Sequence, residues 1–472
     1  MRLAILSFER SVIYKAALLG ALSIVLVFST ASRPAGASVS VPTLGHFAAA
    51  PKEKVIYSFS AVDGQYPTAP LLSDGNGALY GTTLAGGAGC MGSGGCGVVF
   101  KLVPVNKKYK LAFEYSFKGG NDGAYPWGGL VADSSGSLYG TTQQGGTGPC
   151  YPSGSIYFGC GTVFKLTPSG STYAETILYN FQGGNDGYTP YDSLVIDKSG
   201  ALYGTTIAGG GSPACGTLSG GGPVGCGTVF ALSRSGSGYK EKVLHAFQGS
   251  PNDGATLFAG ITLGASGTLL GTTAQGGTGS CSAFGISGCG TVFSLKASGK
   301  NYKVLHSFQG APDGQFGFGN VLFDSSTGDI IGATQYGGNG PCSGQTYVGC
   351  GAVYTMAPVR KTYTEAVVYN FQGPTSDAFD VFGTLLRKSD GSLYGTSGGG
   401  GAYRGGTVFR LAPSGSSYTE TFVYSFRGAP DGLRPYAGLV ADAKGTLYGT
   451  TYYGGTGPCS SGGCGTVYRI TP

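Results

Sequence analysis

Charged residues are scarce in this 472-residue chain, where Asp, Glu, Lys and Arg together make up 11% of the sequence. Aromatic residues make up 12% and hydrophobic residues 41%, whereas disordered chains are rich in charge and poor in aromatics. The 91 glycines do not recur at every third position, which excludes a collagen-like triple helix. The composition therefore predicts a folded chain that is long enough to build a sizeable core.

Several signatures of chemistry are also missing. Histidine occurs three times, and neither an HExxH zinc motif nor a P-loop is present. Lys plus Arg total 29 against 23 for Asp plus Glu, a small excess with no clustered basic face of the kind that binds nucleic acid. We therefore expect no nucleic-acid partner, no cofactor and no metal. The sequence does not establish whether the chain is an enzyme, although the missing motifs favour a non-catalytic protein.

The N-terminus has the features of a secretory signal peptide. It is basic at Arg2, Arg10 and Lys15, continues into the 13-residue apolar run 16–28, and reaches an Ala-x-Ala site at 35–37. We expect a signal peptide over residues 1–37, a short lead over 38–53, and a protein that is secreted, periplasmic or at the cell surface. An uncleaved anchor is the alternative, but 13 helical residues span only about 20 Å of the roughly 30 Å hydrocarbon core. No later segment has a membrane-spanning pattern.

Twelve cysteines fall into six local pairs, as expected for disulfides in an exported chain. A zinc site is the alternative, but most gaps are longer than the usual C-x2-4-C spacing and the pairs lie far apart in sequence. The predicted disulfides join Cys90 to Cys96, Cys150 to Cys160, Cys215 to Cys226, Cys281 to Cys289, Cys342 to Cys350, and Cys459 to Cys464.

A repeat of about sixty residues dominates residues 54–472. The block Leu-Tyr-Gly-Thr-Thr of 138–142 recurs seven times with variations, its central glycine at positions 81, 140, 204, 271, 332, 395 and 449. Blocks resembling Gly-Thr-Val-Phe and Tyr-Ser-Phe accompany each copy. All are β-branched or aromatic and are bounded by Gly, Asp, Ser or Pro, which is typical of short strands.

Each unit therefore reads as four antiparallel strands, which in the second unit are expected at 130–132, 138–142, 162–166 and 175–181. Seven such units predict an all-β, seven-bladed β-propeller. The first unit begins with a Tyr-Ser-Phe strand and the last unit lacks one, so we expect the N-terminal strand to complete the last blade and close the ring. A β-solenoid is the alternative, although sixty residues is long for one coil.

This combination of LYGTT, GG, GTVF, YSF and DG motifs resembles the bacterial "choice-of-anchor tandem repeat GloVer-containing" proteins over residues 54–472. The resemblance implies an exported or surface-displayed protein of no established activity. It also implies an anchor after the repeats, whereas here the repeats run to Pro472.

The strand order places the Asp-Gly loops and the cysteine loops on one face of the ring. Near the start of each innermost strand an aromatic column is expected on that face, and it either rings the channel mouth, where sugars could stack, or packs between blades. The seven positions are Thr68, Trp127, Tyr191, Phe258, Phe318, Phe382 and Tyr436.

Most acidic residues follow the repeat. Asp192 and Asp380 depart from it near the expected mouth, in blades nearly opposite each other, which is a poor arrangement for the paired carboxylates of a glycosidase. The loop aspartates could bind calcium, but Asp-Gly is a common turn. His245 and His306 occupy the Tyr position of Tyr-Ser-Phe and are interpreted as structural.

The sequence thus favours an exported, non-catalytic and monomeric propeller that binds a ligand, either a polysaccharide or a cell-surface protein. A structural component of the surface or matrix is the first alternative. A glycan-active enzyme is the second, with Asp192, Asp380 and Arg404 as its polar candidates.

Overall fold

The computed structural model describes residues 52–471, except 91–93, 151–158, 217–224, 237, 284, 345–346, 375–376 and 460–461. The predicted signal peptide and nearly all of the predicted lead lie outside this range. The first strand begins at Lys52, two residues before the predicted start of the repeats. None of the described helices is long and apolar enough to cross a membrane.

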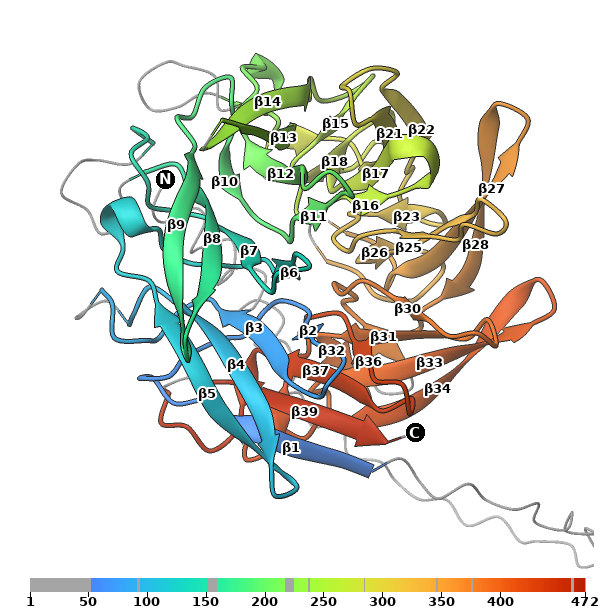
Figure 1. Cartoon of the computed structure of the whole chain (residues 1–472). Coiled ribbons are helices and arrows are strands. Elements are labelled where there is room, and N and C mark those ends of the chain that lie inside the picture. Colours follow the sequence, from blue (N-terminus) through green and yellow to red (C-terminus); the bar gives the residue numbers. More distant parts are fainter. Residues whose placement is uncertain are drawn as a thin grey trace, which may run out of the picture. The chain divides into compact units, whose positions relative to one another are not determined.

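Seven antiparallel sheets form the blades of a β-propeller, each with four main strands, and blade 3 has β10 as a fifth strand (Figure 1). Each blade is given from its innermost to its outermost strand. Blades 1 to 4 are β2 (Leu72–Ser73), β3 (Leu79–Thr83), β4 (Val98–Val105) and β5 (Lys108–Ser116); β6 (Val131–Ala132), β7 (Leu138–Thr142), β8 (Thr162–Ser169) and β9 (Thr172–Asn180); β11 (Val195–Ile196), β12 (Leu202–Ala208), β13 (Thr228–Ser235) and β14 (Gly238–Ala246); and β16 (Thr262–Leu263), β17 (Thr268–Thr273), β21 (Thr291–Lys296) and β22 (Lys303–Ser307). Blades 5 to 7 are β24 (Leu322–Phe323), β25 (Ile330–Thr334), β27 (Ala352–Val359) and β28 (Thr362–Asn370); β30 (Leu386–Arg387), β31 (Leu393–Ser397), β33 (Thr407–Ser414) and β34 (Ser417–Ser425); and β36 (Val440–Ala441), β37 (Leu447–Thr451), β39 (Thr466–Thr471) and β1 (Lys52–Ser58).

Short strands on the loop face supplement the blades. They are β10 (Tyr188–Pro190), which pairs with β12; β15 (Gly254–Ala255) with β18 (Gln275–Gly276); β19 (Ser282–Ala283) with β20 (Ile286–Ser287); β23 (Gly314–Gln315) with β26 (Tyr336–Gly337); β29 (Ala378–Phe379) with β32 (Gly399–Gly400); and β35 (Gly432–Leu433) with β38 (Tyr453–Gly454). Three 3-10 turns are described: η1 (Gly120–Asp122), η2 (Pro213–Cys215) and η3 (Ala265–Gly267).

The ring closes as the sequence predicts. The N-terminal β1 pairs antiparallel with the C-terminal β39, from Lys52 opposite Thr471 to Ser58 opposite Thr466. Blade 7 therefore contains strands from both ends of the chain, as the blue and red ribbons in Figure 1 show. Closure of this kind removes the two free sheet edges that an open array would expose.

The glycine of the Leu-Tyr-Gly-Thr-Thr block makes room for an aromatic ring on the neighbouring strand. In blade 2, a Cβ atom on Gly140 would lie 2.5 Å from the ring of Phe164, the Phe of Gly-Thr-Val-Phe. Gly332 stands in the same relation to Tyr354 of blade 5. These rings are fully buried, so the two repeated blocks are complementary halves of one packing unit.

The first threonine of the same block joins five of the seven blades to the next one. In blade 1, the Thr82 hydroxyl donates to the carbonyl of Gly128 at 2.9 Å. Blades 2, 3, 4 and 6 repeat this bond to the next blade in the ring. Blade 5 has Ala333 at this position and lacks the hydroxyl. The repeated sequence thus encodes contacts between blades as well as strands within them.

The predicted strands of the second unit are present with different ends. The inner strand is confined to 131–132, and the two outer strands extend to 162–169 and 172–180. The two outer strands form a longer hairpin than predicted, because their tips extend beyond the core and remain paired up to Ser169 and Thr172. The aromatic column precedes the inner strands and does not start them.

Candidate functional site on the loop face

The twelve cysteines form the six disulfides that their spacing predicts. In blade 2, the pair Cys150–Cys160 packs on Gly183 in the segment that follows the outer strand of the same blade. Each disulfide therefore lies where the long loop between the second and third strands meets the outgoing segment. Six disulfides indicate an oxidising, extracytoplasmic environment.

The aromatic column forms a ring of contacts that is continuous over six of the seven blades. From Trp127 through to Tyr436, each of the six aromatic side chains lies against the next, with ring centroids 4.6 to 5.1 Å apart. Tyr436 also contacts Tyr452, which directly follows β37 at its loop-face end. The members of the ring are Trp127, Tyr191, Phe258, Phe318, Phe382 and Tyr436, and all six are half-buried.

Thr68 is the break in this aromatic ring. Its hydroxyl donates to the carbonyl of Trp127 at 2.9 Å, so it holds the next blade by a hydrogen bond and adds no ring surface. On the other side of the break, Tyr66 stacks on Tyr452 at 4.8 Å. The aromatics therefore pack between blades, and each of the six stays partly exposed.

Two residues before each column position, the backbone turns through the left-handed region in all seven blades. This conformation is unusual for residues other than glycine and often marks a site under strain. Because every blade has it, the turn belongs to the architecture of this propeller. The residues are Tyr66, Tyr125, Thr189, Thr256, Phe316, Asp380 and Arg434, with φ between 57° and 67°.

Asp380 occupies this turn in blade 6 and lies at the centre of a polar cluster. Its Oδ1 accepts a hydrogen bond from Gln335 Nε2 at 2.5 Å. Burial raises the pKa of Asp380 to about 6, while the Gln335 bond and the positive charge of Arg434 act in the opposite direction. We call Gln335, Tyr347, Asp380, Arg434 and Tyr436 the Asp380 cluster.

The remaining members of the Asp380 cluster supply ring faces and a cation. Tyr347 stacks on Tyr336 with centroids 4.0 Å apart, and Arg434 lies 5.8 Å from the ring of Tyr453. The Arg434 Nη1 lies 3.5 Å from the Tyr436 hydroxyl, which links the cluster to the aromatic ring. Blade 6 is also the blade without a cysteine pair, and its loop between the second and third strands is short.

Asp192, the other predicted mouth carboxylate, is hydrogen-bonded to the backbone of its own blade and of the next one. Its Oδ1 accepts from the backbone of Ser193 at 2.5 Å and its Oδ2 from the backbone of Gly260 in blade 4 at 3.0 Å. Burial raises its pKa. Among the described residues, no hydrogen bond joins Asp192 to Asp380. Arg404 lies exposed in the short loop of blade 6.

The seven loop aspartates brace the junctions between blades. Each carboxylate accepts a hydrogen bond from the Tyr or His of the Tyr-Ser-Phe block at 2.6 to 3.0 Å, and another from a backbone amide nearby. The pairs are Tyr57–Asp63, Tyr115–Asp122, Tyr179–Asp186, His245–Asp253, His306–Asp313, Tyr369–Asp377 and Tyr424–Asp431.

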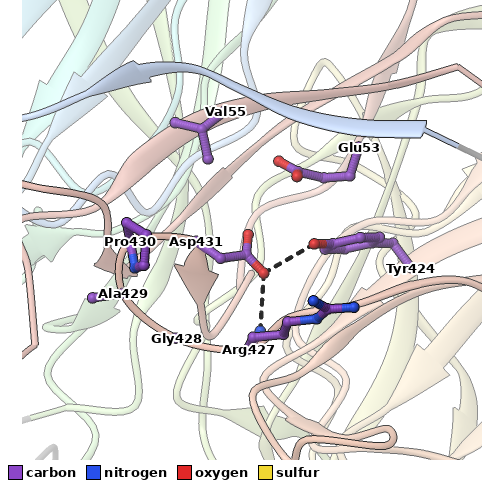
Figure 2. A pocket seen from close by; sticks show the side chains of 8 residues that line it. All are labelled: Glu53, Val55, Tyr424, Arg427, Gly428, Ala429, Pro430 and Asp431. Atoms are coloured by element: carbon purple, nitrogen blue, oxygen red, sulfur yellow. Dashed lines mark hydrogen bonds between the residues drawn. The ribbon is translucent and has the colours of Figure 1, made fainter.

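A glutamate from the next blade faces the aspartate at five of these seven junctions. Figure 2 shows the junction of blades 6 and 7, where Glu53 of β1 faces Asp431 and Tyr424 across a pocket of about 530 Å³. In every one of the five, a buried glutamate oxygen accepts no hydrogen bond from the described residues. The glutamates are Glu53, Glu175, Glu241, Glu365 and Glu420.

Acid is expected to stabilise this propeller. Burial first, and the nearby aspartate second, raises the pKa of Glu53, Glu175 and Glu241 from 4.5 to about 7. Burial likewise raises the pKa of Glu420 to about 9. The folded chain therefore binds more protons than the unfolded chain above pH 4.5, so its stability grows as the pH falls from 8 to 5. Thermal unfolding followed by circular dichroism is expected to give a higher Tm at pH 5 than at pH 8.

Glu175→Gln is the matched variant for this pH dependence. The neutral amide removes the charge that burial penalises, so the variant is expected to unfold at a higher temperature than the parent at pH 8 and to depend less on pH. A Tm that stays constant or falls between pH 8 and pH 5 in the parent chain contradicts the prediction.

One short segment matches a hydrolase nucleophile pattern but has a structural role. Residues 395–399 read Gly-Thr-Ser-Gly-Gly and match Gly-x-Ser-x-Gly, the pattern of hydrolase nucleophiles. Here Ser397 replaces the second threonine of the repeated block and is fully buried. Its hydroxyl donates to the carbonyl of Gly399 and lies 2.8 Å from the Thr407 hydroxyl. It has the structural role of the equivalent threonines.

The profile described as the Gloeobacter/Verrucomicrobia repeat matches residues 35–217 and 211–456. The chain belongs to this family. The match confirms the resemblance seen in the LYGTT, GTVF and YSF blocks of this Gloeobacter/Verrucomicrobia repeat protein. No curated protein matches the chain.

Solved structures similar to the chain are distant. A candidate 6-phosphogluconolactonase from Bacteroides fragilis NCTC 9343 is 12% identical, with a TM-score of 0.47 over 80% of this chain and 89% of its own. A candidate glucose dehydrogenase from Thermus thermophilus is 17% identical, with a TM-score of 0.39 over 73% of this chain and 96% of its own. At such identities and scores, no activity is transferred from either protein.

Proposed function

We propose that this chain is an exported, non-catalytic binding propeller whose loop face takes a polysaccharide. The observation that carries the proposal is the ring of six half-buried aromatics beside the Asp380 cluster. Sugar rings present apolar C–H faces that stack on aromatic side chains, and a few polar groups then fix the orientation of the hydroxyls.

The Asp380 cluster supplies those polar groups on one side of the mouth. A carboxylate, an amide and a guanidinium lie together there with the ring of Tyr347. We expect a smaller contribution from Asp192, because each of its oxygens already accepts a backbone hydrogen bond. We therefore expect the ligand to contact Trp127 and Tyr191 on one side and Asp380 on the other.

Calorimetry with a panel of bacterial and plant polysaccharides tests whether the oxidised chain 38–472 binds any of them. Trp127→Ala and Asp380→Asn are each expected to weaken a positive interaction about 5- to 30-fold, because each removes a contact of roughly 1–2 kcal/mol. Trp127→Phe keeps an aromatic face and is expected to retain most of the affinity.

Val359→Ala is the control for this experiment. Val359 is 48% exposed at the hairpin on the opposite face, and its loss leaves the mouth unchanged. Polysaccharide binding that survives both mouth variants contradicts this site. A folded chain that binds none of the panel favours a protein partner or a structural role in place of a polysaccharide.

A further inference from the structure

One of the seven blade junctions brings an imidazole and two carboxylates together. At the junction of blades 4 and 5, His306 comes from β22, Asp313 from the loop after it, and Glu365 from β28 one repeat later. One ligand atom of each side chain lies within 4.8 Å of the corresponding atoms of the other two. The His306 Nε2 is 3.0 Å from Asp313 Oδ2.

Two oxygens at this junction are buried without a hydrogen-bond donor. Asp313 Oδ1 and Glu365 Oε1 accept no hydrogen bond from the described part of the chain. The same part of the chain offers no lysine or arginine in an ion pair with either carboxylate. Buried carboxylate oxygens are costly unless a donor, a proton or a cation satisfies them.

The other blade junctions differ from this one in the side chains that they carry. Five of the seven have a tyrosine in place of the histidine, and a phenol is a poor ligand at neutral pH. The junction of blades 3 and 4 has a histidine, His245, but Tyr302 stands at the glutamate position and donates to Asp253. Among the seven junctions, only that of blades 4 and 5 combines His, Asp and Glu within the described residues.

We propose that His306, Asp313 and Glu365 bind a divalent first-row transition metal ion of the zinc class. One imidazole nitrogen and two carboxylate oxygens match the mixed donor set that zinc accepts, whereas calcium prefers six to eight oxygens. The ion balances the two carboxylates and satisfies their orphaned oxygens. Because the His306 side chain is 21% exposed, water completes the coordination.

This site joins blade 4 to blade 5, since the ligands come from both. The sequence alone predicts no metal site, because His306 occupies the tyrosine position of the Tyr-Ser-Phe block and Asp313 the aspartate position of the Asp-Gly loop. Glu365 is separated from them by a whole repeat, and only the pairing of neighbouring blades makes it the third ligand. The proposal is independent of polysaccharide binding at the mouth.

Calorimetry with ZnCl2 tests the proposal on the untagged, chelator-treated and oxidised chain 38–472. We expect one zinc ion per folded chain, and a Tm that rises with zinc concentration because the ion binds only the folded state. Cobalt is expected to bind the same site and to give an absorption spectrum of a tetrahedral or five-coordinate ion.

His306→Tyr is the main variant, because it recreates the tyrosine–aspartate pair that five other junctions already carry and is therefore expected to fold. Both His306→Tyr and Glu365→Gln are expected to abolish the stoichiometric zinc binding and the Tm rise. His245→Tyr, the matched change at the neighbouring junction, is expected to leave both intact. Absence of zinc binding by the folded parent chain overturns the proposal, and so does equal binding by the parent and His306→Tyr.

Discussion

A chain that begins at residue 59 is expected to lose at least about 3 kcal/mol of stability relative to one that begins at residue 38. The deletion removes β1, whose Val55, Ile56 and Tyr57 are half-buried against the neighbouring blades, and burial of such side chains contributes roughly 1.5–3 kcal/mol each when complete. It also exposes the backbone edge of β39, an available template for pairing with another chain. We expect a much lower Tm and concentration-dependent aggregation.

A circular permutant distinguishes the effect of losing β1 from the effect of moving β1 to the other end of the chain. Lys52 lies opposite Thr471, so residues 50–60 appended after Pro472 can form a tight hairpin with β39. Blades 2, 3, 5 and 6 already join their two outer strands through such a hairpin. The permutant is therefore expected to recover most of the lost Tm. A chain beginning at residue 59 that unfolds like the parent would show that closure contributes little.

Reduction of the six disulfides is the second change for which we expect a large effect. It is expected to lower the Tm by about 10 °C. Each disulfide closes a short loop, since its two cysteines are separated by 5 to 11 positions along the sequence. Loops of this size restrict the unfolded chain by roughly 2–3 kcal/mol each, although the contributions are not additive. Thermal unfolding with and without a thiol reductant measures the effect.

Paired Cys→Ala variants provide the control. Removing Cys281 and Cys289 together is expected to lower the Tm by a few degrees and to reduce the further fall caused by the reductant. Cys289 is fully buried in the core, so this variant also loses packing, whereas the reductant keeps both side chains and removes only the cross-link. An unchanged Tm after complete reduction, verified by mass spectrometry, would contradict a stabilising role of these disulfides.

The repeat was enough to predict the fold. Seven copies of four short blocks, with one strand displaced from the last unit to the first, specify a closed ring of four-stranded blades. The cysteine spacing likewise predicted each disulfide, because both partners lie in one local loop. The strand ends were less accurate, since the outer hairpin of blade 2 extends past the apolar block into polar residues such as Thr172.

The candidate sites were predicted only in part. The aromatic column was found from the sequence because its members recur at one position of the repeat. The partners of Asp380 were not, because Gln335 belongs to the preceding blade and Arg434 to the following one. The match of Ser397 to a nucleophile pattern shows the reverse case, in which a local motif falls on a buried residue that makes the structural hydrogen bonds of the repeat.

The blade, its seven repetitions, the closure strand and the disulfides follow from the sequence alone, because each of these depends on residues that recur or lie close together in the chain. The tertiary structure decided which side chains of neighbouring blades meet. Glu53 faces Asp431 from the other end of the chain, and Glu365 joins His306 from one repeat away. Such contacts depend on how adjacent sheets tilt and pack, and the strand pattern of a single repeat does not encode that geometry.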